Sequence, residues 1–355
     1  MFHKPLWMQN WKQGKYVIVL FWLSTLYLLP YEYYTNAHHT AKYLRDTTDT
    51  YYSYHLSGES PTFFPALLLI ALATVLIGWE RHNQTIDFFW SMPFKRSHLF
   101  LSKWFFGTVH IVSALSVSWF LMYIVYKTTI HAEYQSFTPF HLYFAYTIMT
   151  LIAVYSLALF IGTITGNIIS QGALSYIIMV FPIYIFQLAF PFFALHADLS
   201  QQEYNNAYIK SSLYTENTSI IAPLAHFTIN YDYDPHREAI KNEDGTIHAG
   251  PTYHHIPSAW TLLSPAIYMI ICLPLGTYLY ARSPNEHNGK ILLYQRLHVY
   301  FSTCTSICFG LLGTEIFTDG SKSIPLHYMY FIGFGILTYF ILQRMSKHKL
   351  SLYAK

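Results

Sequence analysis

The sequence Trp79-Glu80-Arg81-His82-Asn83-Gln84-Thr85-Ile86-Asp87-Phe88-Phe89-Trp90-Ser91-Met92-Pro93-Phe94-Lys95-Arg96 separates two apolar runs of membrane-spanning length. One run ends at Trp79 and the next begins near Phe100. Charges of both signs, several large aromatic residues and a proline stand between them. This pattern favours a short amphipathic helix at the membrane surface, over residues 80–98. A plain connecting loop is the alternative.

The composition of the chain indicates a membrane protein. Of its 355 residues, 53% are hydrophobic and only 11% are charged, whereas soluble domains carry about 25% charged residues. The net charge of +3 is small, and no basic run is interleaved with aromatic residues, so we expect no nucleic-acid partner. The three cysteines lie inside apolar runs, and we expect neither a disulfide framework nor a metal or cofactor in this chain.

Eight apolar runs approach the length of about 20 residues that a membrane helix needs. They predict an all-α polytopic protein with about eight transmembrane helices. The runs are Tyr16–Tyr33, Thr62–Trp79, Phe100–Tyr126, Phe140–Thr165, Ile168–Leu195, Ser258–Ala281, Leu297–Thr314 and Leu326–Leu342.

The distribution of charge predicts the orientation of these runs. With the N-terminus inside the cell, two thirds of the 21 Lys and Arg residues fall in the shorter, inner segments. Of the 18 acidic residues, only Glu80, Asp87 and Glu286 fall there. The positive-inside rule therefore predicts that both termini are cytoplasmic in a cell membrane.

The runs divide the chain into five predicted parts. Residues 1–15 form an N-terminal interfacial helix, for which an ordinary aromatic flank is an equal alternative. Residues 16–195 hold helices one to five, and residues 258–343 hold helices six to eight. Residues 344–355 form a cytoplasmic tail.

The fifth part, residues 196–257, is predicted to be a small extracellular α/β domain between helices five and six. Ser200-Gln-Gln-Glu203 has the pattern of a capping box before a helix that continues to about Leu213. The segment His226–Tyr233 alternates like a strand, and Asp244-Gly245 fits a turn between two more short strands.

The chain lacks the signatures of an energy source or an enzyme. No charged residue falls in the middle of a predicted span, where proton-coupled and ion-coupled transporters keep carboxylates. The nearest approach to a phosphate-binding loop is Gly289-Lys290, which is followed by Ile, and no hydrolase or zinc-protease motif occurs. If the protein moves a solute, the energy must therefore come from a partner.

The opening stretch suits such a partner. Its apolar side chains recur at helical spacing along one face, and its polar ones lie largely on the other. The apolar set is Ile86, Phe89, Trp90 and Pro93, and the polar set is Glu80, Asn83, Asp87 and Ser91. An aromatic face of this kind fits a groove on another protein, although it fits lipid headgroups equally well.

A second inner segment, Arg282–Arg296, echoes the first. Glu286, His287, Asn288, Gly289 and Ile291 correspond, with one gap, to part of the stretch that begins at Glu80. Both segments follow a span that enters from outside. Glu286, Gly289 and Arg296 are therefore candidates for a second cytoplasmic contact.

The motif also resembles that of a known family. Glu80, Thr85, the pair Phe88-Phe89, Pro93, Arg96 and Lys103 resemble the pattern of the type V ABC exporter permeases. The long outer segment, the Glu286…Gly289 segment and the eight spans are most similar to the Gram-positive Ytr-type permeases. The family often has Gly before the Thr, where this chain has Gln84.

The resemblance implies a permease subunit of a bacterial ABC exporter, with a coupling helix that docks on a separate ATPase. Glu80, Thr85, Ile86, Phe88, Phe89, Trp90, Pro93 and Arg96 would make that contact. It also implies a second permease subunit, the same or related, and ATP and Mg²⁺ bound by the ATPase rather than by this chain. The alternative is a non-transporting sensor or scaffold that binds ligand through residues 199–257, and a membrane-embedded enzyme acting on lipid is a third possibility.

Overall fold

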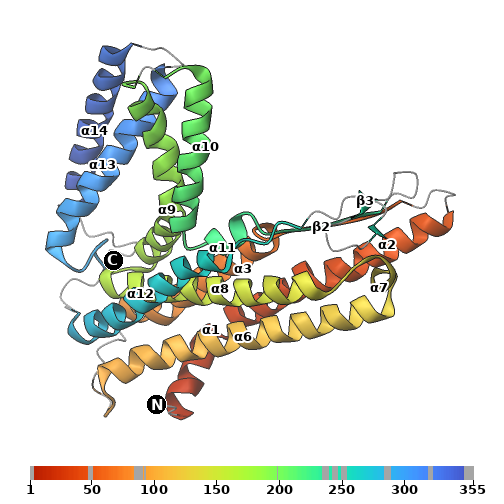
Figure 1. The fold of residues 1–355 in the computed structure, drawn as a ribbon. Coiled ribbons are helices and arrows are strands. Elements are labelled where there is room, and N and C mark those ends of the chain that lie inside the picture. Colours follow the sequence, from red (N-terminus) through yellow and green to blue (C-terminus); the bar gives the residue numbers. More distant parts are fainter. Residues whose placement is uncertain are drawn as a thin grey trace. The chain divides into compact units, whose positions relative to one another are not determined.

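The computed structural model is predominantly helical (Figure 1). It describes residues 4–46, 51–83, 91, 93–197, 199–233, 240–241, 247–248, 254–283, 289–318 and 323–347.

Within the described residues, the prediction of eight membrane-spanning helices is confirmed. Each has the length and apolar composition needed to cross a bilayer. The spans are Lys4–Asp46, Ser60–His82, Arg96–Thr128, Thr138–Ile164, Ile168–Ala194, Ala259–Arg282, Arg296–Thr318 and Ile324–Arg344.

The individual elements follow in chain order. The α-helices are α1 Lys4–Leu26, α2 Glu32–Asp46, α3 Ser60–Ala73, α4 Trp79–His82, α6 Arg96–Thr128, α7 His131–Tyr134, α8 Thr138–Ile164, α9 Ile168–Ala194, α10 Gln201–Thr218, α11 Ala222–Ala225, α12 Leu263–Arg282, α13 Gln295–Thr318 and α14 Ile324–Lys347. The strands are β1 Tyr52–Ser57, β2 Thr228–Tyr233, β3 Ile240–Lys241 and β4 Ile247–His248. Two π-helical turns, Tyr27–Tyr31 and Thr74–Gly78, interrupt the first two spans, and a 3₁₀ turn at Ala259–Leu262 precedes α12.

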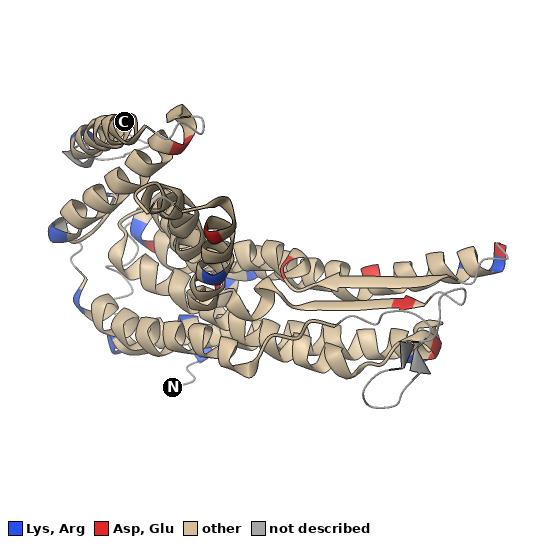
Figure 2. Ribbon diagram, turned by 45° about the horizontal axis from the view of Figure 1, so that its top comes forward, with Lys and Arg blue, Asp and Glu red and all other residues tan. Residues whose placement is uncertain are grey.

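Charged residues lie mostly near the ends of the helices and in the connections between them (Figure 2). The long stretches between those ends carry almost no charged residues. A charged side chain at the centre of a membrane helix is costly to insert into a bilayer. The described helices form two compact units, each with its own core. The first unit comprises Met1–Leu72, Ser102–Ser156 and Ile220–Ile271, and the second comprises Ala73–Leu101, Leu157–Ser219 and Cys272–Lys355.

The first unit contains a closed ring of buried hydrogen bonds at the ends of its helices. The Tyr33 hydroxyl donates to Gln135 Oε1 over 2.7 Å, and Gln135 Nε2 donates to the hydroxyl of Tyr52. The Tyr52 hydroxyl lies 2.6 Å from Nδ1 of His131, whose Nε2 lies 3.1 Å from the carbonyl oxygen of Tyr33. The ring closes if neutral His131 carries its proton on Nε2 and accepts the bond from Tyr52 on Nδ1.

The predicted strand near residues 226–233 is confirmed as β2, but its partner was not predicted. β2 pairs antiparallel with β1, which comes from the connection between the first two spans. The register places Tyr54 opposite Tyr231. The main sheet of residues 196–257 is therefore shared with another connection. Within the segment, the two short predicted strands are confirmed as β3 and β4, which pair antiparallel with each other. The Asp244-Gly245 turn lies outside the described residues.

The predicted capping box is confirmed at the start of α10. The Ser200 hydroxyl accepts from the backbone N–H of Glu203, and the carboxylate of Glu203 accepts from the backbone N–H of Ser200. The helix continues to Thr218, beyond the predicted end at Leu213. It packs on α9 through aromatic rings, with Tyr208 5.6 Å from Phe186 between centroids.

The N-terminal segment is helical, but it is no separate element. α1 continues through residue 15 into the first span without a break. Trp7 packs edge-on against Phe106 at 4.8 Å, and both Trp7 and Trp11 stack on His110. Its placement along the membrane surface stays a prediction.

In the second unit, α8 and α9 meet through a buried glutamine. The Gln171 side chain is fully buried and donates from Nε2 to the carbonyl oxygen of Ala158 over 3.1 Å. A Cβ atom at Gly162 would lie 2.5 Å from that nitrogen, so the close approach requires glycine. The Gln171 side chain is therefore part of the packing between α8 and α9.

Candidate functional site

Most of the predicted docking face lies outside the described residues. This applies to Thr85, Ile86, Phe88, Phe89 and Trp90. It applies also to Glu286 of the second segment. The structure describes the two ends of the stretch Glu80–Arg96 and the two helices that flank it, α4 and α6.

At the first end, α4 carries two adjacent buried charges. Glu80 and Arg81 are each only 1% exposed. The carboxylate of Glu80 is thus enclosed by the subunit itself, although the sequence suggested it as part of an exposed docking face. The neighbouring His82 is exposed, so burial changes within one turn of helix.

Arg81 joins three connections that are far apart in the sequence. Its Nη1 donates to the carbonyl oxygen of Thr165 over 3.0 Å, and its Nη2 donates to the hydroxyl of Ser283 over 3.3 Å. Thr165 lies in the turn between α8 and α9, and Ser283 follows the last residue of α12. Because a buried guanidinium needs such partners, Arg81 fixes the end of α4 to both sites.

The other end of the stretch is tied to the same helix. Pro93 is exposed, and Arg96 begins α6. Nη1 of Arg96 donates to the carbonyl oxygen of Ala281 over 3.1 Å, on the exposed surface. Arg81 and Arg96 therefore anchor both flanks of the predicted coupling stretch to the carboxyl end of α12.

The second predicted segment packs against the turn between α8 and α9. The N–H of Gly289 donates to the carbonyl oxygen of Gly166 over 2.8 Å, and the N–H of Leu293 donates to that of Ile164 over 2.9 Å. Gly289 has a φ of +90°, a conformation that favours glycine. This backbone conformation explains why glycine suits position 289 of the second predicted segment. Arg296, the last residue of the segment, is exposed.

Tyr294 lies close to the guanidinium of Arg81. Burial raises the pKa of the Tyr294 hydroxyl, and the positive charge of Arg81 opposes part of that rise. Tyr280, on α12, is fully buried in the same region. Both tyrosines interact electrostatically with Arg81, in addition to its hydrogen-bond partners.

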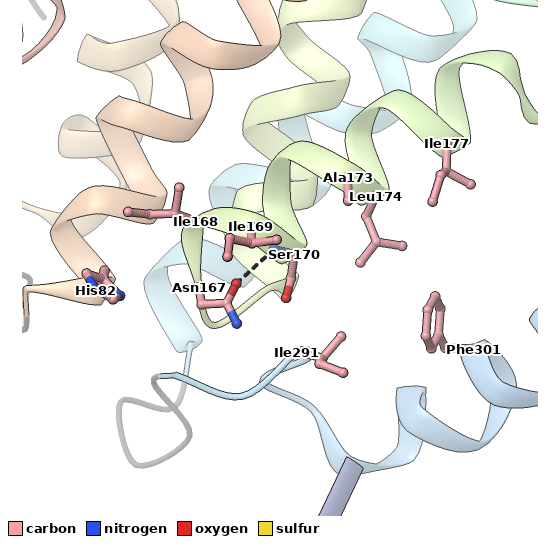
Figure 3. A pocket seen from close by; sticks show the side chains of 10 residues that line it. All are labelled: His82, Asn167, Ile168, Ile169, Ser170, Ala173, Leu174, Ile177, Ile291 and Phe301. Carbon is pink, nitrogen blue, oxygen red and sulfur yellow. Dashed lines mark hydrogen bonds between the residues drawn. The ribbon is translucent and has the colours of Figure 1, made fainter. Parts of the chain in front are cut away.

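Beside this cluster lies a pocket of about 380 Å³ (Figure 3). Its walls come from α4, the first three turns of α9, the 289–294 segment and α13. The ten described residues that line it are His82, Asn167, Ile168, Ile169, Ser170, Ala173, Leu174, Ile177, Ile291 and Phe301. Asn167 caps α9, because its Oδ1 accepts from the backbone N–H of Ser170 over 2.8 Å.

The sequence did not predict that Arg81 joins connections that are distant along the chain. That residue counted only as one positive charge on the inner side. The available signal was an arginine beside a glutamate at the end of an apolar run, a place where a charge is costly unless it is paired. No sequence pattern pointed to Thr165 or Ser283 as its partners.

Taken together, the eight apolar spanning helices of the described residues and the short connections at their ends define a multi-pass membrane protein. The sequence pattern of the family described as ABC-2 family transporter protein matches residues 6–187, just over half of the chain. The chain therefore belongs to this family, and it is a permease subunit of an ABC transporter.

Two relatives from Bacillus subtilis (strain 168) align with most of the chain. The first is the probable ABC transporter permease YtrC, which is 24% identical over 260 residues, 70% of this chain and 67% of the relative. The second is the probable ABC transporter permease YtrD, 23% identical over 282 residues, 79% of this chain and 76% of the relative. The resemblance to the Ytr-type permeases is thereby confirmed. No solved structure matches the chain.

Proposed function

We propose that this chain is the membrane subunit of an ATP-driven exporter, and that the stretch Glu80–Arg96 docks on a separate ATPase. The observation that carries the proposal is the anchoring of both flanks of that stretch to α12, by Arg81 and by Arg96. A segment held at both ends transmits a displacement to the helix that holds it.

The proposed mechanism uses these anchors as a lever. ATP-driven closure of the ATPase pushes on the stretch between α4 and α6, the second and third spans. Arg81 passes the movement to the end of α12 through Ser283, and to the turn between α8 and α9 through Thr165. The helices then open the pathway outward. The π-helical turn at Thr74–Gly78, directly before α4, gives the second span a local irregularity of the kind often found at functional sites.

The segment Arg282–Arg296 is proposed as the second contact with the ATPase. Its backbone hydrogen bonds to the turn between α8 and α9 hold it beside Arg81. Exposed Arg296 and the residues around Glu286 would then meet the partner together with the first stretch. ATP and Mg²⁺ bind to the ATPase in this proposal, and hydrolysis takes place there.

The proposed assembly contains two permease subunits, identical or related, and two ATPase subunits below them. Both termini lie in the cytoplasm of a bacterial cell, as the excess of Lys and Arg on the inner side favours. Both relatives are probable ABC transporter permeases, which supports a partner ATPase in general.

Co-purification of the permease with an ABC ATPase from its own cells tests the docking proposal. The double variant Phe89→Ala/Trp90→Ala removes the aromatic face of the stretch. We expect a loss of ATPase from the purified complex, because buried aromatic anchors carry most of the energy of such contacts, typically at least about 2 kcal/mol each. The stimulation of ATPase activity by the permease should fall in parallel.

A matched control exists at the opposite end of the same span. Phe63 and Phe64 are also an adjacent aromatic pair, and they are 49% and 52% exposed. The variant Phe63→Ala/Phe64→Ala should leave ATPase binding unchanged. Retention of both binding and stimulation in Phe89→Ala/Trp90→Ala would show that the docking proposal is wrong.

A further inference from the structure

The pocket beside the Arg81 cluster is lined mainly by apolar side chains, and its few polar side chains lie toward one end. Exposed His82, together with Asn167 and Ser170, lies at one end, and the other end is formed by Leu174, Ile177 and Phe301 (Figure 3). The ten described lining residues include no carboxylate. A pocket of this size and lining is typical of a site for a small amphipathic molecule.

The depth of the pocket matches one leaflet of a bilayer. Its wall follows α9 from Asn167 to Ile177, about 15 Å at 1.5 Å per residue. The hydrocarbon core of a membrane is about 30 Å thick, so the pocket extends from the surface to mid-depth. Ile169 is 63% exposed and Ile177 is 49% exposed, which leaves this wall open along the side of the span.

Basic residues flank two of the lining residues in the sequence. Lys290 directly precedes the lining residue Ile291, and exposed Arg296 lies five residues before Phe301 on the chain. With exposed His82, these groups attract a negative charge at the level where α9 and α13 enter the membrane. An apolar cavity without polar partners excludes water and accepts an apolar chain instead.

From these features we propose that the pocket binds one acyl chain of an anionic phospholipid of the inner leaflet. The chain lies along α9 between Leu174, Ile177 and Phe301, and the phosphate faces His82, Lys290 and Arg296. The assignment to the inner leaflet rests on the proposed orientation of the permease. Because Ile291 forms one wall, the lipid stabilises the 289–294 segment where that segment packs on the turn between α8 and α9.

The test uses the whole permease in lipid nanodiscs, with a phosphatidylglycerol probe that carries a photoreactive diazirine on one acyl chain. Illumination followed by peptide mapping should label the lining segments 167–177 and 289–301. Each basic residue near a membrane surface strengthens the binding of anionic lipid roughly fivefold. Unlabelled phosphatidylglycerol should therefore compete at least about fivefold better than phosphatidylcholine.

A pocket-filling variant separates this site from general contact with lipid. Ala173→Trp places an indole in the pocket, and labelling of both segments should fall about tenfold, as expected when a ligand loses its cavity. The control Gly333→Trp adds the same ring to a position of α14 where a Cβ meets nothing within 4 Å, and labelling should persist. A second variant, Lys290→Glu, should remove the preference for phosphatidylglycerol while the fold is retained.

Three results would overturn the proposal: wild-type labelling absent from both segments, equal labelling in Ala173→Trp, or equal competition by the two phospholipids. Binding of the ATPase is measured on the same preparations. Loss of labelling with intact ATPase binding refutes the lipid site alone. Labelling that persists without ATPase binding refutes the docking proposal alone.

Discussion

Arg81 shows how a charge becomes acceptable at the end of a membrane helix. Its guanidinium is buried, but two of its nitrogens donate to oxygen atoms of Thr165 and Ser283. A lysine has one nitrogen on a flexible chain and does not reproduce a planar group with separated donors. The geometry therefore requires arginine at this position.

We predict that Arg81→Met strongly destabilises the permease. Each hydrogen bond from a charged donor contributes about 1.5–3 kcal/mol, so the free energy of unfolding should fall by about 3 kcal/mol or more. Arg81→Lys should recover only part of this loss. Thermal unfolding of the purified permease in detergent measures the change.

Arg296→Met is the control, because Arg296 is exposed. Substitutions at such surface positions usually alter stability by less than about 0.5 kcal/mol. Equal unfolding temperatures for the two variants would contradict a structural role for Arg81.

His131 is neutral at physiological pH. Burial lowers the pKa of its imidazole to about 4, and the hydrogen bond to the carbonyl of Tyr33 opposes part of that decrease. Protonation would place a second proton on the ring and break the bond that Nδ1 accepts from Tyr52. The closed ring of hydrogen bonds is therefore incompatible with the charged form.

This arrangement predicts that the permease loses stability in acid. The unfolded chain binds a proton at His131 below its ordinary pKa of about 6.5, whereas the folded chain does so only near 4. The stabilisation is thus complete above about pH 6.5 and decreases as the pH falls toward 4, by about 3 kcal/mol in total.

Unfolding temperatures of the wild type and of His131→Gln, measured between about pH 7.5 and about pH 4, test this expectation. The variant should be less stable at neutral pH, and its stability should fall less with acidification. Parallel curves for the two proteins would exclude His131 as the source.

At the scale of elements, the α8–α9 hairpin depends on one close approach. The missing side chain at Gly162 makes room for the amide of Gln171, which hydrogen-bonds Ala158. At Gly172, on the other helix of the hairpin, an added Cβ would meet only Thr74 Oγ1, at 3.8 Å. Gly162 and Gly172 therefore offer a matched pair of substitution sites within one helical hairpin.

We predict opposite effects for alanine at these two positions. Gly162→Ala should destabilise the permease by about 1–3 kcal/mol, because the new methyl group displaces the Gln171 amide. Gly172→Ala should be neutral or stabilising by about 0.5–1 kcal/mol, because alanine favours a helix. Unfolding in detergent compares them.

The double variant Gly162→Ala/Gln171→Ala supplies the decisive comparison. Removal of the amide makes room for the methyl group, so the two substitutions should be non-additive. Additive losses would mean that Gly162 acts through some other contact.

At the scale of the molecule, the connections that contact one another are those that eight spans would place on the same side of a membrane. Arg81, Thr165 and Ser283 lie at the ends of the second, fourth and sixth spans, and they meet one another. β1 follows the first span and β2 follows the fifth, and these strands pair. Connections separated by an even number of spans lie on the same side of a membrane, so the contacts agree with the predicted topology.

A disulfide cross-link tests the pairing of β1 with β2. Ser53 lies opposite Asp232 in the register, and facing residues in antiparallel strands have Cα atoms about 4.5–5.5 Å apart. The variant Ser53→Cys/Asp232→Cys should therefore oxidise readily, because a disulfide accommodates about 4.4–6.8 Å. Peptide mapping by mass spectrometry detects the bond.

The control pair, Ser53→Cys/Thr228→Cys, places the second cysteine four residues along the strand, about 13 Å from the first. This pair should remain reduced under the same conditions. Equal oxidation of both pairs would indicate that the strands slide or do not pair.

The sequence by itself determined the eight spans and the capped start of α10, and it predicts which side of the membrane the charged segments face. These features depend on local composition and on contacts between residues three or four positions apart, which are readable along the chain. The tertiary structure alone decided that Arg81 joins Thr165 and Ser283, 84 and 202 residues away. It alone paired β1 with β2 and formed the pocket along α9, because such contacts arise only when helices distant in sequence pack together.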